Sequence, residues 1–284
     1  MNYLLCTALL LSSSAALAED RNFDRTLNVT SSPNLSVTTG SGNIHLIGGS
    51  DNQVHIVGHI HSSHGWMSGG NESIEAHMQR IADNPPIVQN GNEIVIGEKR
   101  SSDLFRNISI DYDITLPRAS NISANSGSGD VEIQDAGASL KAGTGSGSVR
   151  ARGIRGAASL ETGSGDIELS EAGSGDIKAE TGSGSIRLST ISGGLKAETG
   201  SGDIRIDGHP TSDWKVESGS GNIQLKIGYA TKCTLNASNG SGSIHINQPF
   251  TMQGDLDRHH VSASINGGGP VIKAETGSGD ISVD

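Results

Sequence analysis

The tripeptide Gly-Ser-Gly occurs ten times in this chain of 284 residues, and its spacing constrains the fold more than any other feature. The copies begin at Gly40, Gly127, Gly145, Gly163, Gly173, Gly182, Gly200, Gly219, Gly240 and Gly277. From the second to the ninth copy the steps are 18, 18, 10, 9, 18, 19 and 21 residues, so a nine-residue unit is usually doubled to about eighteen. A fixed period of this kind is typical of a stacked repeat architecture.

Short segments with alternating apolar and polar residues follow the Gly-Ser-Gly copies, as in Asp166-Ile167-Glu168-Leu169. A second alternating phrase, Leu-Lys-Ala-Glu-Thr, is found at residues 195–199. Alternation with a period of two indicates strands, and glycine at the repeated tripeptide indicates turns, because glycine adopts backbone angles that other residues avoid. The sequence therefore predicts an all-β fold, a parallel β-helix or β-solenoid with about 18 residues per coil.

Stacked coils would place one outward side chain of each coil in a column, with neighbours about 4.8 Å apart. This position is occupied by Glu132, Arg150, Glu168, Arg187, Arg205, Gln224 and His245. Its first four residues alternate in charge, which keeps like charges from lying opposite each other. The column supports a stack in which each coil pairs with the next one along the chain.

The chain divides into three predicted regions. Residues 1–18 form a signal peptide, residues 19–117 an irregular β region continuous with the solenoid, and residues 118–284 the regular repeats with an insertion at about 247–270. Within the irregular region, apolar residues at i, i+4 and i+7 followed by a Pro-Pro pair predict one short helix at about 71–83. A helix near one end of a solenoid is expected to cover the core or an exposed strand edge.

The first eighteen residues are apolar and end in Ala-Leu-Ala before Glu19-Asp20, which is typical of a cleaved secretory signal. Its removal would leave Cys233 as the single cysteine, so no internal disulfide is expected and the thiol is interpreted as a small buried hydrophobe. No other apolar run is long enough to span a bilayer, so no transmembrane segment is predicted in the mature chain. We therefore expect export to the periplasm or to the cell surface and extracellular space.

Several motifs occur in an order that resembles one known family. An early Gly-Ser-Gly-Asn-Ile strand (40–44) is followed by an Ile-x-Leu-Pro strand (114–117), by Ser-Gly-Ser-Gly-Asp-Val-Glu-Ile (126–133) and by the ladder of repeats. This order resembles the DUF4097 family of bacterial adhesin-like β-strand-repeat proteins over nearly the whole mature chain. The resemblance implies an exported parallel β-helix, and it brings no established catalytic residues.

Histidine and aspartate give two candidate metal sites. His55, His59 and His61 lie on one face of a predicted strand, where a His-x-His pair can chelate zinc; the alternative is a polar strand face that happens to use histidine. Aspartate follows half of the Gly-Ser-Gly copies, but its spacing differs from that of calcium-binding β-rolls. Serine and asparagine replace it in the other copies, which favours hydrogen bonding within turns over calcium binding.

Catalysis has little support in the sequence. Nucleophile, phosphate-loop and dinucleotide motifs are missing, so we expect no enzyme activity and no cofactor. Parallel β-helices do include polysaccharide-processing enzymes, in which neighbouring coils supply paired carboxylates, and Asp166 with Asp176 or Glu161 with Glu180 would be candidates. A solenoid brings equivalent carboxylates together at every repeat, so such pairs are weak evidence.

Net charge and amino-acid composition restrict the classes of molecule that this protein can bind. The net charge of −11 argues against nucleic acid, and 3% aromatic residues leave few platforms for sugar stacking. We expect a non-enzymatic, adhesin-like surface or envelope protein that binds a protein or a glycan. The alternative is a structural envelope protein that self-assembles end to end, and a polysaccharide-processing enzyme is less favoured.

Overall fold

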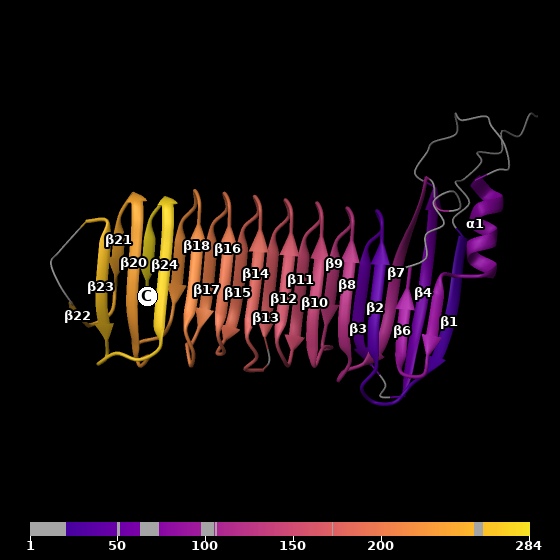
Figure 1. The fold of residues 1–284 in the computed structure, drawn as a ribbon, viewed down its shortest axis with the longest axis horizontal. Coiled ribbons are helices and arrows are strands. Elements are labelled where there is room, and N and C mark those ends of the chain that lie inside the picture. Colours follow the sequence, from indigo (N-terminus) through magenta and orange to yellow (C-terminus); the bar gives the residue numbers. More distant parts are fainter. Residues whose placement is uncertain are drawn as a thin grey trace, which may run out of the picture.

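The structure, a computed structural model, describes residues 21–49, 52–62, 74–97, 105, 107–171, 173–252 and 258–284. The predicted signal peptide lies outside these residues. The described chain forms two long sheets that face each other along one elongated stack (Figure 1). The prediction of an all-β parallel solenoid with one short helix near the N-terminal end is confirmed.

We call the two sheets sheet A and sheet B. Sheet A has twelve strands in the spatial order β1 (Arg21–Asn28), β4 (Gln53–Ser62), β7 (Ile108–Pro117), β3 (Ile44–Gly49), β9 (Val131–Gln134), β11 (Val149–Ile154), β13 (Ile167–Glu171), β15 (Ile186–Ile191), β17 (Ile204–Gly208), β19 (Ile223–Lys226), β25 (Ile281–Val283) and β21 (Ile244–Ile246). From β7 to β21 all neighbouring strands are parallel, as expected of stacked coils.

Sheet B has thirteen strands and runs beside sheet A. Their spatial order is β22 (Phe250–Met252), β23 (His260–Ile265), β20 (Cys233–Ser241), β24 (Val271–Ser278), β18 (Trp214–Ser218), β16 (Leu195–Thr199), β14 (Ile177–Thr181), β12 (Ala158–Thr162), β10 (Ser139–Thr144), β8 (Asn121–Ser126), β2 (Asn34–Thr39), β6 (Glu93–Ile96) and β5 (Ile87–Asn90). In the middle of the molecule each coil therefore contributes one strand to each sheet.

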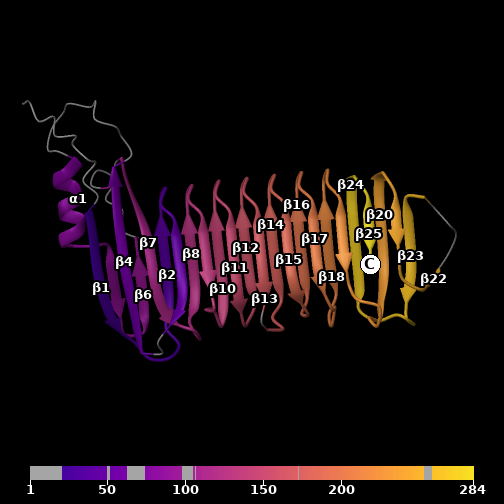
Figure 2. The same cartoon turned by 180° about the vertical axis from the view of Figure 1, so that it is seen from behind.

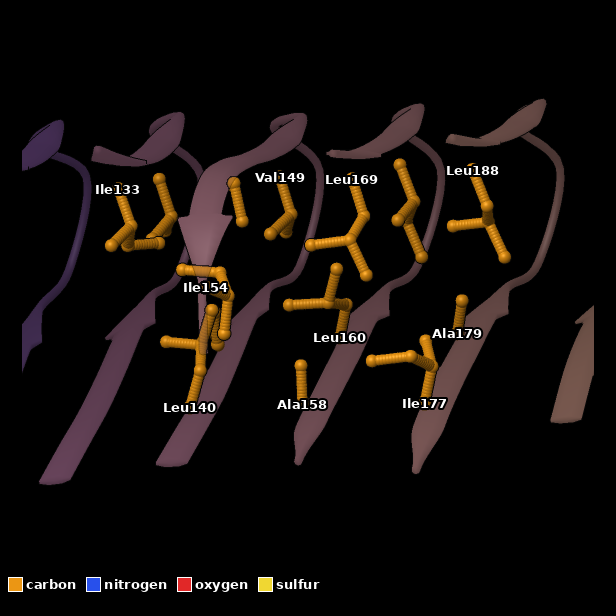
Figure 3. Packing of buried hydrophobic residues seen from close by; sticks show 14 of the residues in the cluster. Ile133, Leu140, Val149, Ile154, Ala158, Leu160, Leu169, Ile177, Ala179 and Leu188 are labelled. Atoms are coloured by element: carbon orange, nitrogen blue, oxygen red, sulfur yellow. The ribbon is translucent and has the colours of Figure 1, made fainter. Parts of the chain in front are cut away.

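The core is the thin layer between the two sheets. Inward side chains such as Val149 and Leu169 of sheet A face Leu160 and Ile177 of sheet B, and all are at most 3% exposed (Figure 3). Alanine fills one inward position in several strands of sheet B, for example Ala179. Small and branched aliphatic residues suffice for so thin a core, which explains the shortage of aromatic residues.

The predicted outward column is real in the middle of the stack. Arg150 lies between Glu132 and Glu168, and Arg187 lies between Glu168 and Arg205, each in parallel register. Strands eighteen or nineteen residues apart are thus direct neighbours there. The first four residues of the column alternate in charge and therefore have oppositely charged register neighbours, whereas Arg187 and Arg205 are like-charged neighbours.

The predicted order of the column is wrong at the C-terminal end, where His245 is not the spatial neighbour of Gln224. Ser282 of β25 lies between them, because β24 and β25 are inserted between the coil of β18 and β19 and the coil of β20 and β21. The end of the chain therefore lies inside the stack (Figures 1 and 2). The segment interpreted as an insertion at 247–270 contains β22 and β23, which extend sheet B with antiparallel strands before the chain returns.

The N-terminal end also departs from chain order. The coil of β2 and β3 lies between the coil of β8 and β9 and the strands β6 and β7, which come later in the chain. Beyond β7, β4 and β1 add antiparallel strands. Helix α1 (Ile74–Asp83) packs against β1 and β4 and buries Met78 and Ile81, so it covers this end as expected of a cap.

The repeated glycines have a different cause from the one expected. Most corner glycines do not have a positive φ; Gly242 and Gly279 are the exceptions. Instead, successive corners touch: a Cβ atom at Gly184 would lie 1.8 Å from the carbonyl oxygen of Gly165 in the preceding coil. Glycine is therefore required for close approach of one coil to the next.

A buried hydroxyl before most of the Gly-Ser-Gly copies fixes the corner; Ala172 and Asn239 precede the copies at Gly173 and Gly240 instead. Thr181 donates a hydrogen bond to the carbonyl of Gly165 in the preceding coil and accepts one from the N–H of Gly184, with distances of 2.9 and 3.1 Å. The same position is occupied by Ser126, Thr144, Thr162, Thr199, Ser218 and Thr276. Each hydroxyl satisfies backbone groups that the turn would otherwise leave unpaired.

Two further expectations concern single features. Cys233 is fully buried, which agrees with its interpretation as a small hydrophobe, and burial raises the pKa of its thiol to about 11. Within the part of the chain that the structure describes, no helix has the length and apolar character needed to cross a membrane.

Candidate binding surface

The outward face of sheet B carries two adjacent columns of opposite charge, which we call the Lys–Glu ladder. Its lysines and glutamates are Lys178, Lys196, Lys215 and Lys273, and Glu161, Glu180, Glu198, Glu217 and Glu275. The columns arise because the phrase Lys-x-Glu recurs in β14, β16, β18 and β24, which are neighbours in register. Alternation along each strand directs both residues outward, with the alanine or valine between them in the core.

Each lysine in the middle of the ladder is shared by two glutamates. Lys196 Nζ lies 2.7 Å from Glu180 Oε1 and 2.9 Å from Glu198 Oε2. Lys178 and Lys215 repeat this arrangement, with nitrogen–oxygen distances of 2.8 to 3.0 Å. The result is a continuous zigzag of ion pairs along four coils, in which the side chains are held in one geometry.

The ion pairs shift the pKa values of the ladder. Hydrogen bonds from Lys178 and then Lys196 lower the pKa of Glu180, and Lys196 lowers the pKa of Glu198. Hydrogen bonds to Glu180 and Glu198 raise the pKa of Lys196. These groups therefore remain charged across the physiological pH range, and the surface presents fixed charges rather than proton donors.

A groove runs beside the glutamate column, where the corner glycines have no side chains. Two hollows of about 570 and 680 Å³ form it, and they meet at Glu198 and Thr199. Along sheet B the groove extends from Asn125 in β8 to Asn239 in β20 and crosses eight neighbouring strands. At about 4.8 Å per strand its length is about 34 Å.

The aspartates after Gly-Ser-Gly act within the structure. Asp166 Oδ1 accepts a hydrogen bond from the backbone N–H of Ser185 in the next coil at 2.8 Å, and Asp130 does the same for Ser148. Asparagine serves equally well, since Asn43 accepts from the N–H of Asp130. This exchangeability supports the turn interpretation of the column over a calcium site.

The three candidate metal ligands lie on the exposed face of β4, each beside an acidic residue. The contacts are His55 with Asp24 at 2.8 Å, His59 with Asp113 at 3.0 Å and His61 with Asp111 at 3.3 Å. Four residues of extended chain separate His55 and His59 by about 13 Å, too far to share an ion. Among the residues described, no group of three histidine, cysteine, aspartate or glutamate side chains is arranged to hold a metal ion. Metal binding here stays a prediction without a preformed ligand set.

The carboxylate pairs considered for catalysis are arranged differently from each other. Asp166 precedes β13 of sheet A whereas Asp176 precedes β14 of sheet B, and each accepts a backbone N–H of the next coil. Glu161 and Glu180 are register neighbours, but Lys178 contacts both. A general acid needs a raised pKa, whereas that of Glu180 is lowered. The geometry gives these pairs a structural role.

Comparison with known sequences decides the family. Residues 50–284 match the family described as Toastrack DUF4097. The chain belongs to the DUF4097 family. The resemblance seen in the order of the repeats is thereby confirmed for most of the chain, including the whole Lys–Glu ladder.

Solved structures with a similar course of the chain include three bacterial proteins. A "putative adhesin" from Bacteroides fragilis is 14% identical, with 94% of this DUF4097 chain and 99% of the other covered and a TM-score of 0.45. A "putative adhesin" from Parabacteroides distasonis is 9% identical, with 94% and 98% covered and a TM-score of 0.31. A "putative cell adhesion protein" from Clostridium sporogenes is 13% identical, with 93% and 99% covered and a TM-score of 0.26. No curated protein matches the sequence.

The sequence already carried the signal for the ladder. Lys-Ala-Glu-Thr occurs at 178–181, 196–199 and 273–276, and Lys-Val-Glu-Ser occurs at 215–218. The repetition indicates a regular outward face of lysine and glutamate. The pairing of each lysine with glutamates of two coils, and the place of Lys273 next to Lys215, required the register of the strands.

Proposed function

We propose that this DUF4097 protein is an exported, non-enzymatic binding module with an adhesin-like role in the periplasm or at the cell surface. The observation that carries the proposal is the Lys–Glu ladder, a rigid outward face that repeats the same charged pair over neighbouring coils. Repeat proteins use such extended faces to bind partners through many weak contacts. A protein or a glycan on an envelope surface is the class of partner that fits.

The state of the charged groups supports binding rather than turnover. Hydrogen bonds from the lysines lower the pKa values of Glu180, Glu198 and Glu275. These carboxyl groups are therefore ionised near neutral pH and do not act as acids. Individual exposed ion pairs contribute little to stability. A long row of them is consistent with a surface role in which position and regularity matter more than the strength of one contact.

Binding of the purified mature protein to intact bacterial or host cells tests the proposal. We expect replacement of Glu180, Glu198 and Glu217 by alanine to abolish saturable binding. The control replaces Glu132, Glu168 and Asp207, three acidic residues on the outward face of sheet A, and changes the net charge equally. Equal loss in both variants, or retained binding in the ladder variant, contradicts the proposal. Fractionation of the expressing cells tests export, and protein confined to the cytoplasm contradicts it.

A second candidate, end-to-end self-association, is favoured by the C-terminal end of sheet A. There Ile244 and Ile246 of β21 are partly exposed, whereas Ile281 and Val283 at the equivalent positions of β25 are fully buried. Nearby Gln248 is 4% exposed, and its amide nitrogen and oxygen have no hydrogen-bond partner in the described part of the structure. Sedimentation over a range of concentrations should show oligomers that Ile244→Lys removes; a monomer at all concentrations contradicts this candidate.

A further inference from the structure

The groove beside the Lys–Glu ladder arises from the fold itself, whereas its length and the residues that line it are set by the sequence of this chain. Corner glycines leave a trough because they have no side chains, and the glutamate column borders it over neighbouring strands. The lining residues are glutamate, glycine, threonine, serine and asparagine. No aromatic, aliphatic or basic side chain is among them, so the trough is polar throughout its length.

The groove offers hydrogen-bond acceptors in a row. A carboxylate has about four acceptor positions. Glu180 uses one oxygen for Lys178 and the other for Lys196, at 2.8 and 2.7 Å, which leaves further positions on both oxygens. Glu198 is bound in the same way by Lys196 and Lys215. The carboxylates are thus held in place and still accept additional hydrogen bonds.

The polar lining and the fixed carboxylates together restrict the kinds of molecule that can bind in the groove. A polycation would have to compete with ammonium groups that already lie against the middle carboxylates. A polyanion would find no positive side chain along the lining, and an apolar peptide would find no aromatic or aliphatic side chain. A chain with many uncharged hydroxyl groups needs neither a positive nor an apolar lining. Each of its hydroxyls can donate a hydrogen bond to a glutamate without displacing a lysine.

We propose that the groove binds a linear, uncharged polysaccharide that lies along the solenoid axis. The proposal rests on the binding role inferred above and assigns its partner to the glycan class. Without aromatic platforms each sugar contributes little, so affinity comes from repetition over several coils. A long oligosaccharide should therefore bind far more tightly than a short one of the same chemistry.

The test uses titration calorimetry of the full mature protein with β-1,4-linked glucose and N-acetylglucosamine oligomers, from disaccharide to octasaccharide. We expect affinity to rise with chain length. Glu198→Ala, at the junction of the two hollows, should weaken octasaccharide binding about tenfold or more. The matched control Glu168→Ala removes a glutamate from the outward face of β13 in sheet A, outside both the ladder and the groove lining, so binding should change by less than about twofold.

A second pair of variants leaves the ladder intact. Gly143 lies in the groove, and a Cβ atom there meets only Asn125 Oδ1 at 3.1 Å and the Glu161 carbonyl at 3.6 Å, so Gly143→Phe fills the groove without a backbone clash. It should lower the length at which affinity stops rising, whereas Lys141→Phe on the same strand should not.

Several outcomes separate this inference from the binding role itself. Affinity that does not depend on oligomer length, or equal losses in Glu198→Ala and Glu168→Ala, overturns the groove as a glycan site. Salt-sensitive binding of polylysine to the groove with no binding of the oligosaccharides also overturns it. If cell binding persists in these cases, the adhesin-like role stands with its partner elsewhere on the surface. If neither cells nor oligosaccharides bind, both proposals fail.

Discussion

The middle of this molecule and its two ends follow different rules although they share one repeat. Between β8 and β19, coils that follow each other in the chain are neighbours in space. At both ends a coil from another part of the chain is inserted: β2 and β3 lie next to β8 and β9, and β24 and β25 lie next to β18 and β19. The same corner and core residues serve both arrangements.

The difference shows what a repeat does and does not specify. A Gly-Ser-Gly corner accepts any neighbouring corner with the same shape, so Gly277 packs on Gly219 as Gly219 packs on Gly200. The order of coils is therefore set by the connections. Short turns force the next coil alongside in the middle, whereas residues 247–270 allow the chain to leave the stack and return.

The largest difference between the regions should appear on deletion. Removal of residues 145–162 takes out one whole repeat and leaves equivalent corners to close on each other, so we expect a folded protein with slightly lower thermal stability. Removal of residues 271–284 also takes out a layer with neighbours on both sides, but the coil of β20 and β21, which carries the antiparallel strands β22 and β23, then has to move by one layer to close the gap, so we expect a larger loss of thermal stability. Circular dichroism and size-exclusion chromatography measure both. Similar behaviour of the two deletions would contradict the inserted position of the last coil.

The next effect concerns contact between corners. Gly184→Ala places a Cβ atom 1.8 Å from the carbonyl oxygen of Gly165, and the backbone on both sides has to shift. We expect the free energy of unfolding to fall by about 2–3 kcal/mol or more. Gly143→Ala, outside a corner, should be neutral or slightly stabilising because it removes glycine from a strand. Thermal or urea unfolding compares them, and equal stability of the two variants would exclude close approach as the reason for the glycines.

The buried hydroxyls should contribute somewhat less. Thr181→Val keeps the shape of the side chain but leaves the Gly165 carbonyl and the Gly184 N–H without their partner. Unsatisfied buried groups cost about 1–3 kcal/mol. Thr234→Val, on the outward face of β20, is the control and should be within about 0.5 kcal/mol of the parent. A destabilisation no greater than that of the control would show that the hydroxyls do not hold the corners.

The smallest effect is the pH dependence of the Lys–Glu ladder. The pKa values of Glu180 and Glu198 are lowered in the folded protein, so their contribution is complete above the usual glutamate pKa of about 4.3 and is lost as the pH falls through the lower folded values. The pKa of Lys196 is raised, so its contribution is lost only as the pH rises through the folded pKa. The groups are largely exposed, so we expect a gentle decline of thermal stability in acid.

Replacement of Lys178, Lys196 and Lys215 by glutamine should flatten that acid decline. Thermal unfolding at a series of pH values compares this variant with the parent protein at low ionic strength, where exposed charges are least screened. An unchanged slope would show that the ladder does not contribute to the pH dependence.

Much of the fold could be predicted because the middle of the chain repeats itself. The period fixed the coil length, and alternation assigned Ile167 and Leu169 to the core. The ends could not be predicted, because the corners at Gly240 and Gly277 have the same sequence and either could follow Gly219. Which coil is inserted depends on tertiary contacts made by the returning antiparallel strands β22 and β23.

The candidate site was visible in part. The recurrence of lysine and glutamate along the repeats can be seen in the sequence. The groove cannot, because it forms only where the glutamate side chains of neighbouring strands project beside corner glycines that lack side chains. The histidines of β4 share a face as alternation predicts. Their acidic partners, such as Asp24 and Asp113, come from antiparallel strands whose pairing has no signature in the repeat.

Disulfide formation between introduced cysteines tests the order of the coils most directly. Gln224 and Ser282 are outward neighbours on parallel strands about 4.8 Å apart, within the range for a disulfide, whereas Gln224 and His245 are two strands apart, at about 10 Å. Under mild oxidation the structure predicts that Gln224→Cys with Ser282→Cys cross-links and that Gln224→Cys with His245→Cys does not. A cross-link in the second pair and none in the first would show that the coils stack in chain order and that the last coil is not inserted.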